Sequence, residues 1–387
     1  MDGEEELGIR RPEVRSSETK EASFAPATPL HTPSPPHPHT PTLSHASSSP
    51  AYTQLQTPAE RDRWILDHRA SRNRLDPQRA YAFVAEQEAG PVGVPVDVAT
   101  LFLTNRECPF RCLMCDLWQN TLEETVPPGA IPAQIRYALE QLPAPQNGPR
   151  HLKLYNAGSF FDPRAIPPAE YPEIARLCAP FERVIVECHP AFIGDRLLQF
   201  RDLLQAQQPN TPTLSSTPQR LTPLLEVAIG LETAHPELLA RLNKRMTLPH
   251  FRQAADFLRE AGIALRVFIL VRPPWLSEAE GLEGAKRSLD FAFDCGASVC
   301  TLIPTRAGNG AMETLAAQGE WEPPTLTTLE KALDYGIRLR AGRVFVDLWD
   351  IGRFAHCLTC TSARIERLRL MNFLQTPCMT ISCKTCN

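Results

Sequence analysis

The chain of 387 residues has 43% hydrophobic and 22% charged residues, a composition typical of a soluble globular protein. Its formal net charge of −4 excludes a bulk positive field that would attract nucleic acid, so any phosphate contact must come from a local basic patch. The N-terminus has no apolar signal core, and no apolar run approaches the ~20 residues of a membrane helix. We therefore expect a cytoplasmic protein with no membrane partner, whose 12 cysteines are metal ligands or packed thiols rather than disulfides.

Composition and spacing divide the chain into four predicted segments. Residues 1–57 are rich in Pro, Ser and His and have little to bury, which predicts a disordered tail. Helical spacing predicts a helical N-terminal extension over 58–97. The core is expected over 98–340, where the polar, Pro-rich stretch 207–221 is interpreted as a surface loop. A cysteine-rich, metal-binding region is expected over 341–387.

Short apolar runs alternate with amphipathic helical stretches through the predicted core, which is the pattern of parallel β/α units. Strands that are almost continuously apolar fit a sheet that is covered on both faces. Periodicity does not distinguish an open sheet from one that curls towards a barrel. The six predicted strands are Val98–Thr104, Leu152–Tyr155, Val184–Glu187, Leu225–Leu231, Leu265–Val271 and Val299–Ile303.

Three cysteines follow the first predicted strand in the sequence ECPFRCLMCDLWQN. Cys108, Cys112 and Cys115 have the spacing C-x3-C-x2-C. Three thiolates on one loop can each hold one iron of a 4Fe–4S cubane, which leaves the fourth iron without a protein ligand. An open metal position is typical of a catalytic site, a rule stated for zinc that we extend by analogy. A structural zinc site fits poorly, because it needs four ligands, usually from two C-x2-C pairs.

Polar residues end the next two predicted strands, and ligands of parallel β/α folds bind at the carboxyl ends of strands. After the second strand, Gly158 allows close approach of the backbone, while Asn156 and Ser159 offer hydrogen bonds; an ordinary tight turn is the alternative. Glu187 ends the third strand and is costly to bury unpaired, so it is a candidate for ribose or substrate contact. His189 is either an acid–base group or a hydrogen-bonded structural histidine.

The later strand ends carry charged residues. Glu232 follows the fourth strand at the same predicted edge. Lys244, after a short helix, either meets a carboxylate or compensates the helix dipole. Arg272 and Arg306 follow the fifth and sixth strands and either clamp an anion or form ion pairs.

The C-terminal region holds two C-x2-C pairs, Cys357/Cys360 and Cys383/Cys386, with Cys378 between them. Paired knuckles of this kind predict a closed tetrahedral zinc site. A second 4Fe–4S cluster, with or without Cys378, is the alternative, and unrelated buried thiols are a third. The remaining cysteines that we assign to core packing are Cys178, Cys188, Cys295 and Cys300.

The triad spacing resembles the hallmark of the radical S-adenosylmethionine superfamily, over residues 98–305. A closer resemblance, from Arg61 to the C-terminus, is to the radical subunit of archaeosine synthase, a group related to the Elongator catalytic subunit and other tRNA-modifying radical enzymes. The phrases that carry it are FLTNRECPFRCLMCDLWQNT, KLYNAGSFFD, VIVECHPAFI, AIGLETAHPELLARLNKRM and GAMETLAAQGEWEPPTLTTLE.

The resemblance implies an α/β fold, a partial (β/α)6 barrel with a disordered tail and a small cysteine-rich appendage. It implies a 4Fe–4S cluster whose open iron chelates S-adenosylmethionine, and an electron donor of flavodoxin or ferredoxin type. Reductive cleavage then gives methionine and a 5′-deoxyadenosyl radical. The implied catalytic residues are Cys108, Cys112, Cys115, Glu187 and Glu232, and the implied cofactor contacts are Asn156, Gly158, Ser159, Phe110, Met114 and Lys244. Met114 stands where the family commonly has an aromatic residue near adenine.

The implied reaction is cleavage of a carbon–nitrogen bond in a lysine adduct on a 7-deazaguanine base of tRNA, and the implied partner is the enzyme that installs the adduct. A radical enzyme acting on a peptide or small metabolite is an alternative. A non-catalytic zinc protein that binds RNA or protein is another. The basic residues considered for phosphate contacts are Arg364, Arg367, Arg369, Lys244, Arg245 and Arg252.

Overall fold

The computed structural model describes residues 51–91, 93–142, 150–207 and 223–386. Most of the predicted tail, 1–57, and nearly all of the predicted loop, 207–221, lie outside the described residues. None of the helices in the described ranges has both the length and the apolar character needed to cross a membrane.

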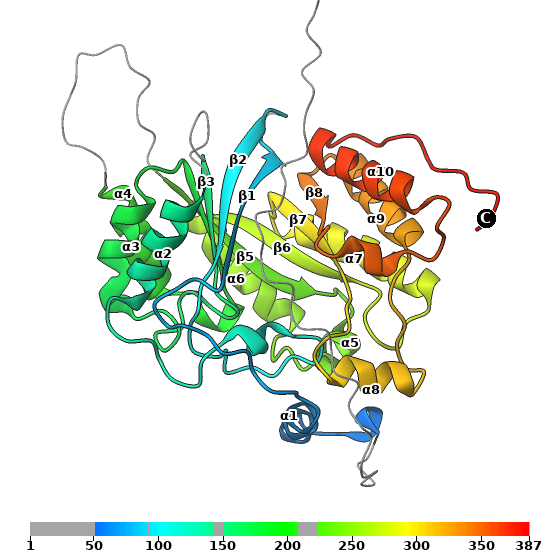
Figure 1. The fold of residues 1–387 in the computed structure, drawn as a ribbon, viewed down its shortest axis with the longest axis horizontal. Helices are drawn as coiled ribbons and strands as arrows, with labels where there is room; N and C mark the ends of the chain where they lie inside the picture. The colour runs from blue at the N-terminus through cyan, green and yellow to red at the C-terminus, as the bar shows by residue number, and fades with distance from the viewer. Residues whose placement is uncertain (1–50, 92, 143–149, 208–222, 387) are drawn as a thin grey trace, which may run out of the picture. The chain divides into compact units, whose positions relative to one another are not determined.

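A single sheet of eight strands organises the described residues, and its strands lie side by side in chain order (Figure 1). Seven strands are parallel, and only β1 pairs antiparallel, with β2. The order never reverses, so right-handed crossovers place the connecting helices on one face and the sheet curls into a partial barrel. The strands are β1 Ala82–Ala89, β2 Pro95–Phe102, β3 His151–Tyr155, β4 Arg183–Glu187, β5 Leu224–Glu232, β6 Ala264–Val271, β7 Val299–Pro304 and β8 Arg343–Val346.

The six strands predicted from apolar runs are therefore confirmed as β2 to β7. One expectation for the N-terminal part was wrong, since 58–97 is not helical throughout. A helix occupies only Pro58–Asp67, and β1 forms one arm of a hairpin with β2. Helical spacing failed here because the outer edge strand carries polar residues such as Glu86 and Glu88, which leave no apolar alternation to recognise.

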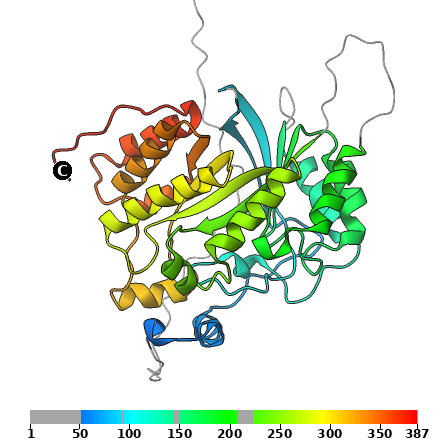
Figure 2. The same ribbon diagram turned by 180° about the vertical axis from the view of Figure 1, so that it is seen from behind.

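Helices cover the convex face of the sheet, as Figures 1 and 2 show from the two sides. Two of the helices begin with capping boxes, at Thr57 and at Ser277. In each, the hydroxyl of the capping residue accepts from the backbone N–H of the glutamate three residues later, and that glutamate accepts from the backbone N–H of the capping residue. The α-helices are α1 Pro58–Asp67, α2 Ala130–Gln141, α3 Tyr171–Cys178, α4 Asp195–Gln205, α5 Pro236–Arg241, α6 Leu248–Glu260, α7 Glu278–Asp294, α8 Ala311–Ala317, α9 Leu326–Leu339 and α10 Thr361–Leu374.

Alternate strand residues point to opposite faces of the sheet. One set, which includes Leu101, Leu154 and Val267, is fully buried against the helices and forms the main hydrophobic core. The other set lines the concave face and is markedly polar: Lys153, Glu226 and Arg266 are all buried there.

A network of paired charges closes the barrel at the amino ends of its parallel strands. Arg266 donates to Glu226 at 2.7 Å and to Glu88 of β1 at 3.2 Å, and Lys153 also pairs with Glu88. Although burial acts to raise the pKa of Glu88, these two cations hold it well below its ordinary value. Arg343 of β8 donates to the backbone oxygen of Ala89 at 2.7 Å, so the end of β1 reaches across to β8.

Candidate functional site

The triad cysteines lie on the loop that leaves the carboxyl end of β2, and each is partly buried. Burial raises the pKa of Cys108 to about 11 and those of Cys112 and Cys115 to about 12. The free thiols are thus neutral, and a metal would bind by displacing their protons. Within the described ranges these sulfurs do not belong to any group of ligand atoms that all lie within 4.8 Å. A wider spacing suits a cubane, where each thiolate binds a different iron.

Ion pairs and two asparagines fix the triad loop from outside. Glu107, one residue before the triad, pairs with Arg69, with Arg72 and with Arg111, so three guanidinium groups converge on one carboxylate. Asn309 donates to the backbone oxygens of Leu113 at 2.7 Å and Cys115 at 3.2 Å. Such support from separate elements holds the thiols in one geometry.

A second asparagine anchors the loop from the end of α5. Asn243 donates to the backbone oxygen of Arg111 at 2.7 Å, and the backbone N–H of Leu113 donates to the backbone oxygen of Leu242 at 3.0 Å. Neither Asn243 nor Asn309 was predicted to have this role. The only sequence signal was the glycine on each side of Asn309, which marked a loop without indicating its contact.

The turn after β3 lies directly against the triad loop. A Cβ added at Gly158 would lie 3.5 Å from the Cβ of Cys108. Ser159 accepts a hydrogen bond from the backbone N–H of His189 at 2.9 Å, so its oxygen connects this turn to the end of β4. Asn156 is fully buried, and neither its side-chain nitrogen nor its oxygen has a partner among the described residues. Each buried polar group without a hydrogen-bond partner costs about 1–3 kcal/mol of folding free energy. The Asn156 amide is therefore a candidate for contact with a ligand.

Two predicted glutamates stand at neighbouring strand ends. Glu187 ends β4, where burial raises its pKa to about 7 and the backbone N–H of Asn156 donates to it at 3.3 Å. Glu232 ends β5 and accepts from the Nζ of Lys244 at 2.6 Å. A Cβ at Gly230 would lie 2.2 Å from the Glu232 carboxylate and 2.5 Å from the Lys244 Nζ, so glycine makes room for this pair.

Lys244 remains a cation beside the triad. Burial alone would lower its pKa, but Glu232 and the nearby thiols of Cys112 and Cys108 raise it above the ordinary value. In the structure the partner of the Lys244 Nζ is the carboxylate of Glu232.

Phe110 and Met114 lie on different sides of the loop. The Phe110 ring packs on that of His189, with centroids 4.0 Å apart, whereas Met114 packs against an apolar cluster that includes Trp64 and Trp321. His189 uses both ring nitrogens: Nε2 donates to the Lys244 backbone oxygen at 2.9 Å, and Nδ1 accepts from the backbone N–H of Ala191 at 3.1 Å. Burial lowers the pKa of His189 to about 3, so the structural interpretation of this histidine is favoured.

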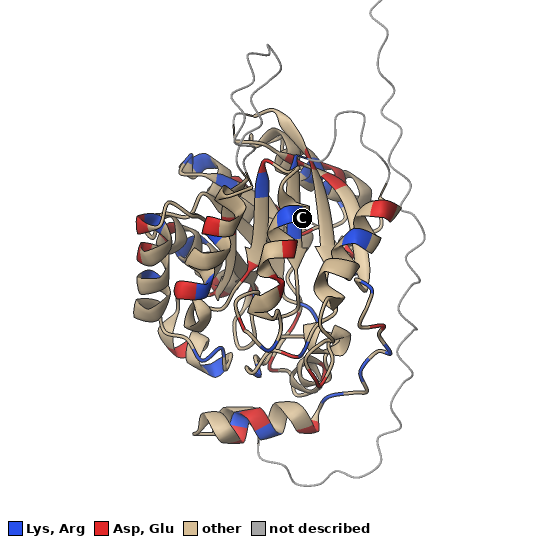
Figure 3. Ribbon diagram, turned by 90° about the vertical axis from the view of Figure 1, so that its left-hand side faces the viewer, with Lys and Arg blue, Asp and Glu red and all other residues tan. Residues whose placement is uncertain are grey.

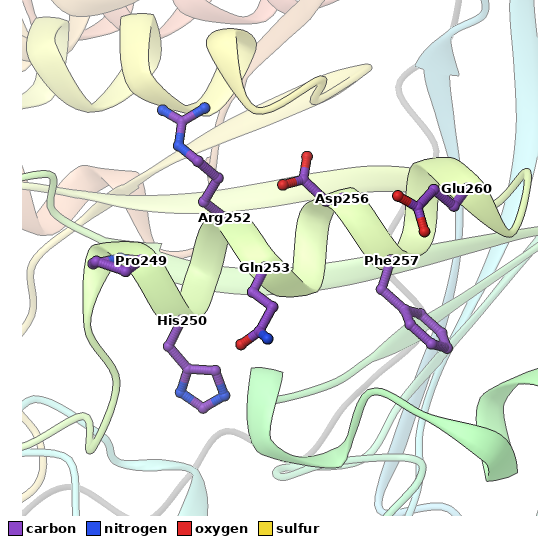
Figure 4. Close-up of a pocket in the computed structure, with 7 residues that line it drawn as sticks. All are labelled: Pro249, His250, Arg252, Gln253, Asp256, Phe257 and Glu260. Atoms are coloured by element: carbon purple, nitrogen blue, oxygen red, sulfur yellow. The ribbon is translucent and has the colours of Figure 1, made fainter.

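A hollow on the outer face of α6 begins close to this site, since the His250 ring lies 6.4 Å from that of His189. Its side chains fan out from the helix in several directions and do not converge (Figure 4). Its charged side chains are of both signs, with Arg252 followed by Asp256 and Glu260. The hollow therefore lacks the convergent polar groups of a built ligand site.

The C-terminal cysteines come together as predicted from their spacing. The sulfurs of Cys357, Cys360, Cys383 and Cys386 all lie within 4.8 Å of one another. Cys378 is not part of the group; it is partly buried, and its sulfur donates to the backbone oxygen of Thr376 at 3.7 Å.

Most of the basic residues considered for phosphate contacts are used inside the protein. Arg364 and Arg367 are buried against Glu330, and Arg245 pairs with Asp62 at 2.5 Å. Figure 3 shows Lys and Arg interspersed with Asp and Glu on the face it draws. Arg272 and Arg306 also form ion pairs, with Glu278 and Asp347 respectively. Helical spacing does not reveal which arginines are buried, so the sequence could not separate these roles.

Known proteins resemble the chain at modest identity, and no family model matches it. An uncharacterized protein of Methanocaldococcus jannaschii is 22% identical over 60% of this chain and 63% of its own length. Archaeosine synthase subunit beta of Thermococcus kodakarensis is 25% identical over 59% of this chain and 66% of that protein. The protein of that name from Methanosarcina acetivorans is 23% identical over 74% and 81%. The chain thus spans just under two thirds of the first two relatives.

The predicted resemblance to a subunit of archaeosine synthase is confirmed, since two of these relatives carry that name. Among solved structures, archaeal Elp3 of Methanocaldococcus infernus aligns with a TM-score of 0.44 and 14% identity, over 64% of this chain and 56% of that one.

Proposed function

We propose that the chain is a radical S-adenosylmethionine enzyme whose Cys108, Cys112 and Cys115 hold a 4Fe–4S cluster. The observation that carries the proposal is the contact between the triad loop and the turn after β3, where the buried amide of Asn156 has no partner among the described residues. When bound, such a cluster and S-adenosylmethionine supply a 5′-deoxyadenosyl radical that removes a hydrogen atom from substrate.

The residues around the triad fit this pair of groups. The donor set is three thiolates on one loop, which leaves one iron open. Asn156 has an unused donor and acceptor for the amino acid part of S-adenosylmethionine. Lys244 adds a buried positive charge that favours a bound carboxylate, while its pairing with Glu232 fixes its position. We assign Phe110, at the side of the loop facing His189, to the adenine contact.

An apolar segment covers the site from outside. Tyr52 and Trp64, before and within α1, pack with Leu113 of the triad loop and with Met312 of α8. Figure 1 draws α1 and α8 at the end of the barrel where the parallel strands finish. We propose that these apolar side chains exclude water and quenchers from a reactive radical.

For the substrate, we propose a 7-deazaguanine nucleoside of tRNA that carries a lysine adduct, with cleavage of its carbon–nitrogen bond. The names of the two archaeosine synthase relatives support this choice, and their designation as a subunit supports a partner enzyme. Glu187 lies at the strand ends with a pKa of about 7, and its carboxyl group is suited to exchange a proton with an amine at neutral pH.

One observation favours a second candidate, radical chemistry on a peptide or small metabolite. Five of the six basic residues considered for phosphate contacts form ion pairs, and of these only Arg369 is largely exposed. The five are Lys244, Arg245, Arg364, Arg367 and Arg369. An RNA substrate would then depend on Arg252, on Arg369 or on the partner subunit.

Anaerobic reconstitution tests the proposal. We expect the wild type to bind iron and sulfide at the triad and to release 5′-deoxyadenosine with a chemical reductant. Cys112→Ala should lose both, while Cys295→Ala, a buried cysteine of the main core, should retain both. Equal iron in wild type and Cys112→Ala would contradict the triad assignment. A colourless protein that contains zinc alone would instead support the non-catalytic alternative.

The substrate is tested separately by mass spectrometry of nucleosides from tRNA incubated with the active enzyme and its partner. Loss of the lysine adduct supports the tRNA proposal. Formation of 5′-deoxyadenosine without any change in the modified nucleoside would favour the second candidate.

A further inference from the structure

The C-terminal cysteines form a compact four-sulfur set. The Cys357 and Cys383 sulfurs are 3.8 Å apart, the Cys360 and Cys386 sulfurs are 3.5 Å apart, and all four lie within 4.8 Å of one another. A tetrahedral zinc ion with bonds of about 2.3 Å places its thiolates about 3.8 Å apart. A cubane holds its thiolates on separate irons, which requires a wider spread. The spacing thus favours a single ion.

The two C-x2-C turns are equivalent in their backbone contacts. The N–H groups of Thr359 and Cys360 both point at the Cys357 sulfur. The N–H groups of Thr385 and Cys386 point in the same way at the Cys383 sulfur. Each turn thus directs two donors at its first sulfur, which stabilises a negatively charged thiolate there.

An arginine connects this group to the rest of the fold. The Nε of Arg364, on α10, donates to the Cys360 sulfur at 3.2 Å, and the same guanidinium pairs with the buried Glu330 of α9. It also donates to the backbone oxygen of Ile381 at 3.3 Å, in the segment that brings in the second turn. Four thiolates around a divalent ion carry a net charge of −2, and Arg364 offsets part of it.

We propose that Cys357, Cys360, Cys383 and Cys386 bind one zinc ion, which fastens the segment after α10 to the α9–α10 pair. All four positions are filled by thiolates, so the site is closed and structural rather than catalytic. Zinc enters by displacing thiol protons, without any change of oxidation state. The proposal does not depend on the function of the triad.

Metal analysis of the full chain tests this site against the second-cluster alternative. We expect about one zinc per chain in the wild type, none in the Cys360→Ser/Cys383→Ser double variant, and no change in the iron bound at the triad. The matched control is Cys378→Ser, a cysteine of the same region outside the four-sulfur set, which should keep its zinc. Loss of iron and sulfide rather than zinc from the double variant would overturn the proposal, as would zinc that stays bound.

A spectroscopic experiment leaves all four C-terminal cysteines in place, so its result does not depend on whether the double variant folds. In Cys112→Ala, which removes a triad ligand, cobalt exchanged into the C-terminal site should give the visible bands of tetrahedral coordination and intense thiolate-to-metal absorption. Octahedral cobalt bands, or no thiolate absorption, would contradict a four-thiolate site.

A third arm tests Arg364. Replacing it with methionine should weaken zinc retention against a competing chelator about 10–100-fold, the usual effect of removing a partner of a metal ligand. Arg369→Met is the control, because Arg369 is on the same helix but exposed. Equal zinc retention in both variants would refute the assigned contact.

Discussion

Asn156 offers a test in which stability and binding are expected to change in opposite directions. Its side chain is fully buried, with neither polar atom partnered among the described residues. If the amide is kept for a ligand, Asn156→Leu should increase the free energy of unfolding in the absence of that ligand. Relief of each unsatisfied group is worth about 1–3 kcal/mol, so we expect a gain of at least about 1 kcal/mol.

The same substitution should weaken S-adenosylmethionine binding. A hydrogen bond to a charged group contributes about 1.5–3 kcal/mol, which corresponds to an affinity loss of about 10–100-fold. Stability is measured by urea denaturation of the cluster-loaded chain under anaerobic conditions, and binding by titration of the same samples with S-adenosylmethionine.

Asn309→Leu is the matched control, a buried amide whose bonds are satisfied. It donates to the backbone oxygens of Leu113 and Cys115 and accepts from the backbone N–H of Met312 at 2.9 Å. Its replacement leaves these groups unpaired and should cost about 3 kcal/mol or more. If Asn156→Leu is destabilised to the same extent and still binds S-adenosylmethionine normally, the assigned role of Asn156 is wrong.

Three further predictions follow from the site. Lys244→Met should lower the free energy of unfolding by about 3–5 kcal/mol, because it leaves Glu232 buried and unpaired. In urea titrations, adding Glu232→Gln to this variant should restore much of the lost stability. Additive effects of the two substitutions would refute the pairing. Burial raises the pKa of Glu187 from about 4.5 to about 7, so the contribution of this one group to stability is fully present below pH 4.5 and is lost as the pH rises through 7. Glu187→Gln should therefore be stabilised relative to wild type more at pH 8 than at pH 5, by up to about 3 kcal/mol. A constant difference between those pH values would contradict the burial argument. Glu107→Gln should loosen the triad loop by removing the charge shared by Arg69, Arg72 and Arg111, seen as faster cluster loss on dilution, whereas unchanged retention would show that the asparagine anchors suffice.

The sequence predicted the parallel strands well because each is a dense apolar run bounded by turn residues, as in Leu265–Val271 and the observed β6. It missed β1, whose inward residues Glu86 and Glu88 are paired with cations from strands distant in sequence. Tertiary pairing of that kind has no local signature, so a polar edge strand whose acidic side chains are paired resembles a segment without regular structure.

The candidate site was partly predictable for a similar reason. Strand-end positions follow from the β/α repeat, which is how Asn156 and Glu187 were found. Contacts between segments far apart were not predictable. Examples are the pairing of Lys244 with Glu232 and the use of Arg364 to contact Cys360 rather than phosphate. The four C-terminal cysteines are the exception, because metal-ligand spacing is itself a local signal of a long-range contact.

The most direct test of the central claim is electron paramagnetic resonance of the reduced, reconstituted chain with and without S-adenosylmethionine. Three cysteine ligands leave one iron open, so the account predicts a 4Fe–4S signal in the wild type whose g values shift when S-adenosylmethionine is added, and no triad signal in Cys112→Ala. A cluster signal that S-adenosylmethionine leaves unchanged, or one that persists unaltered in Cys112→Ala, would contradict it.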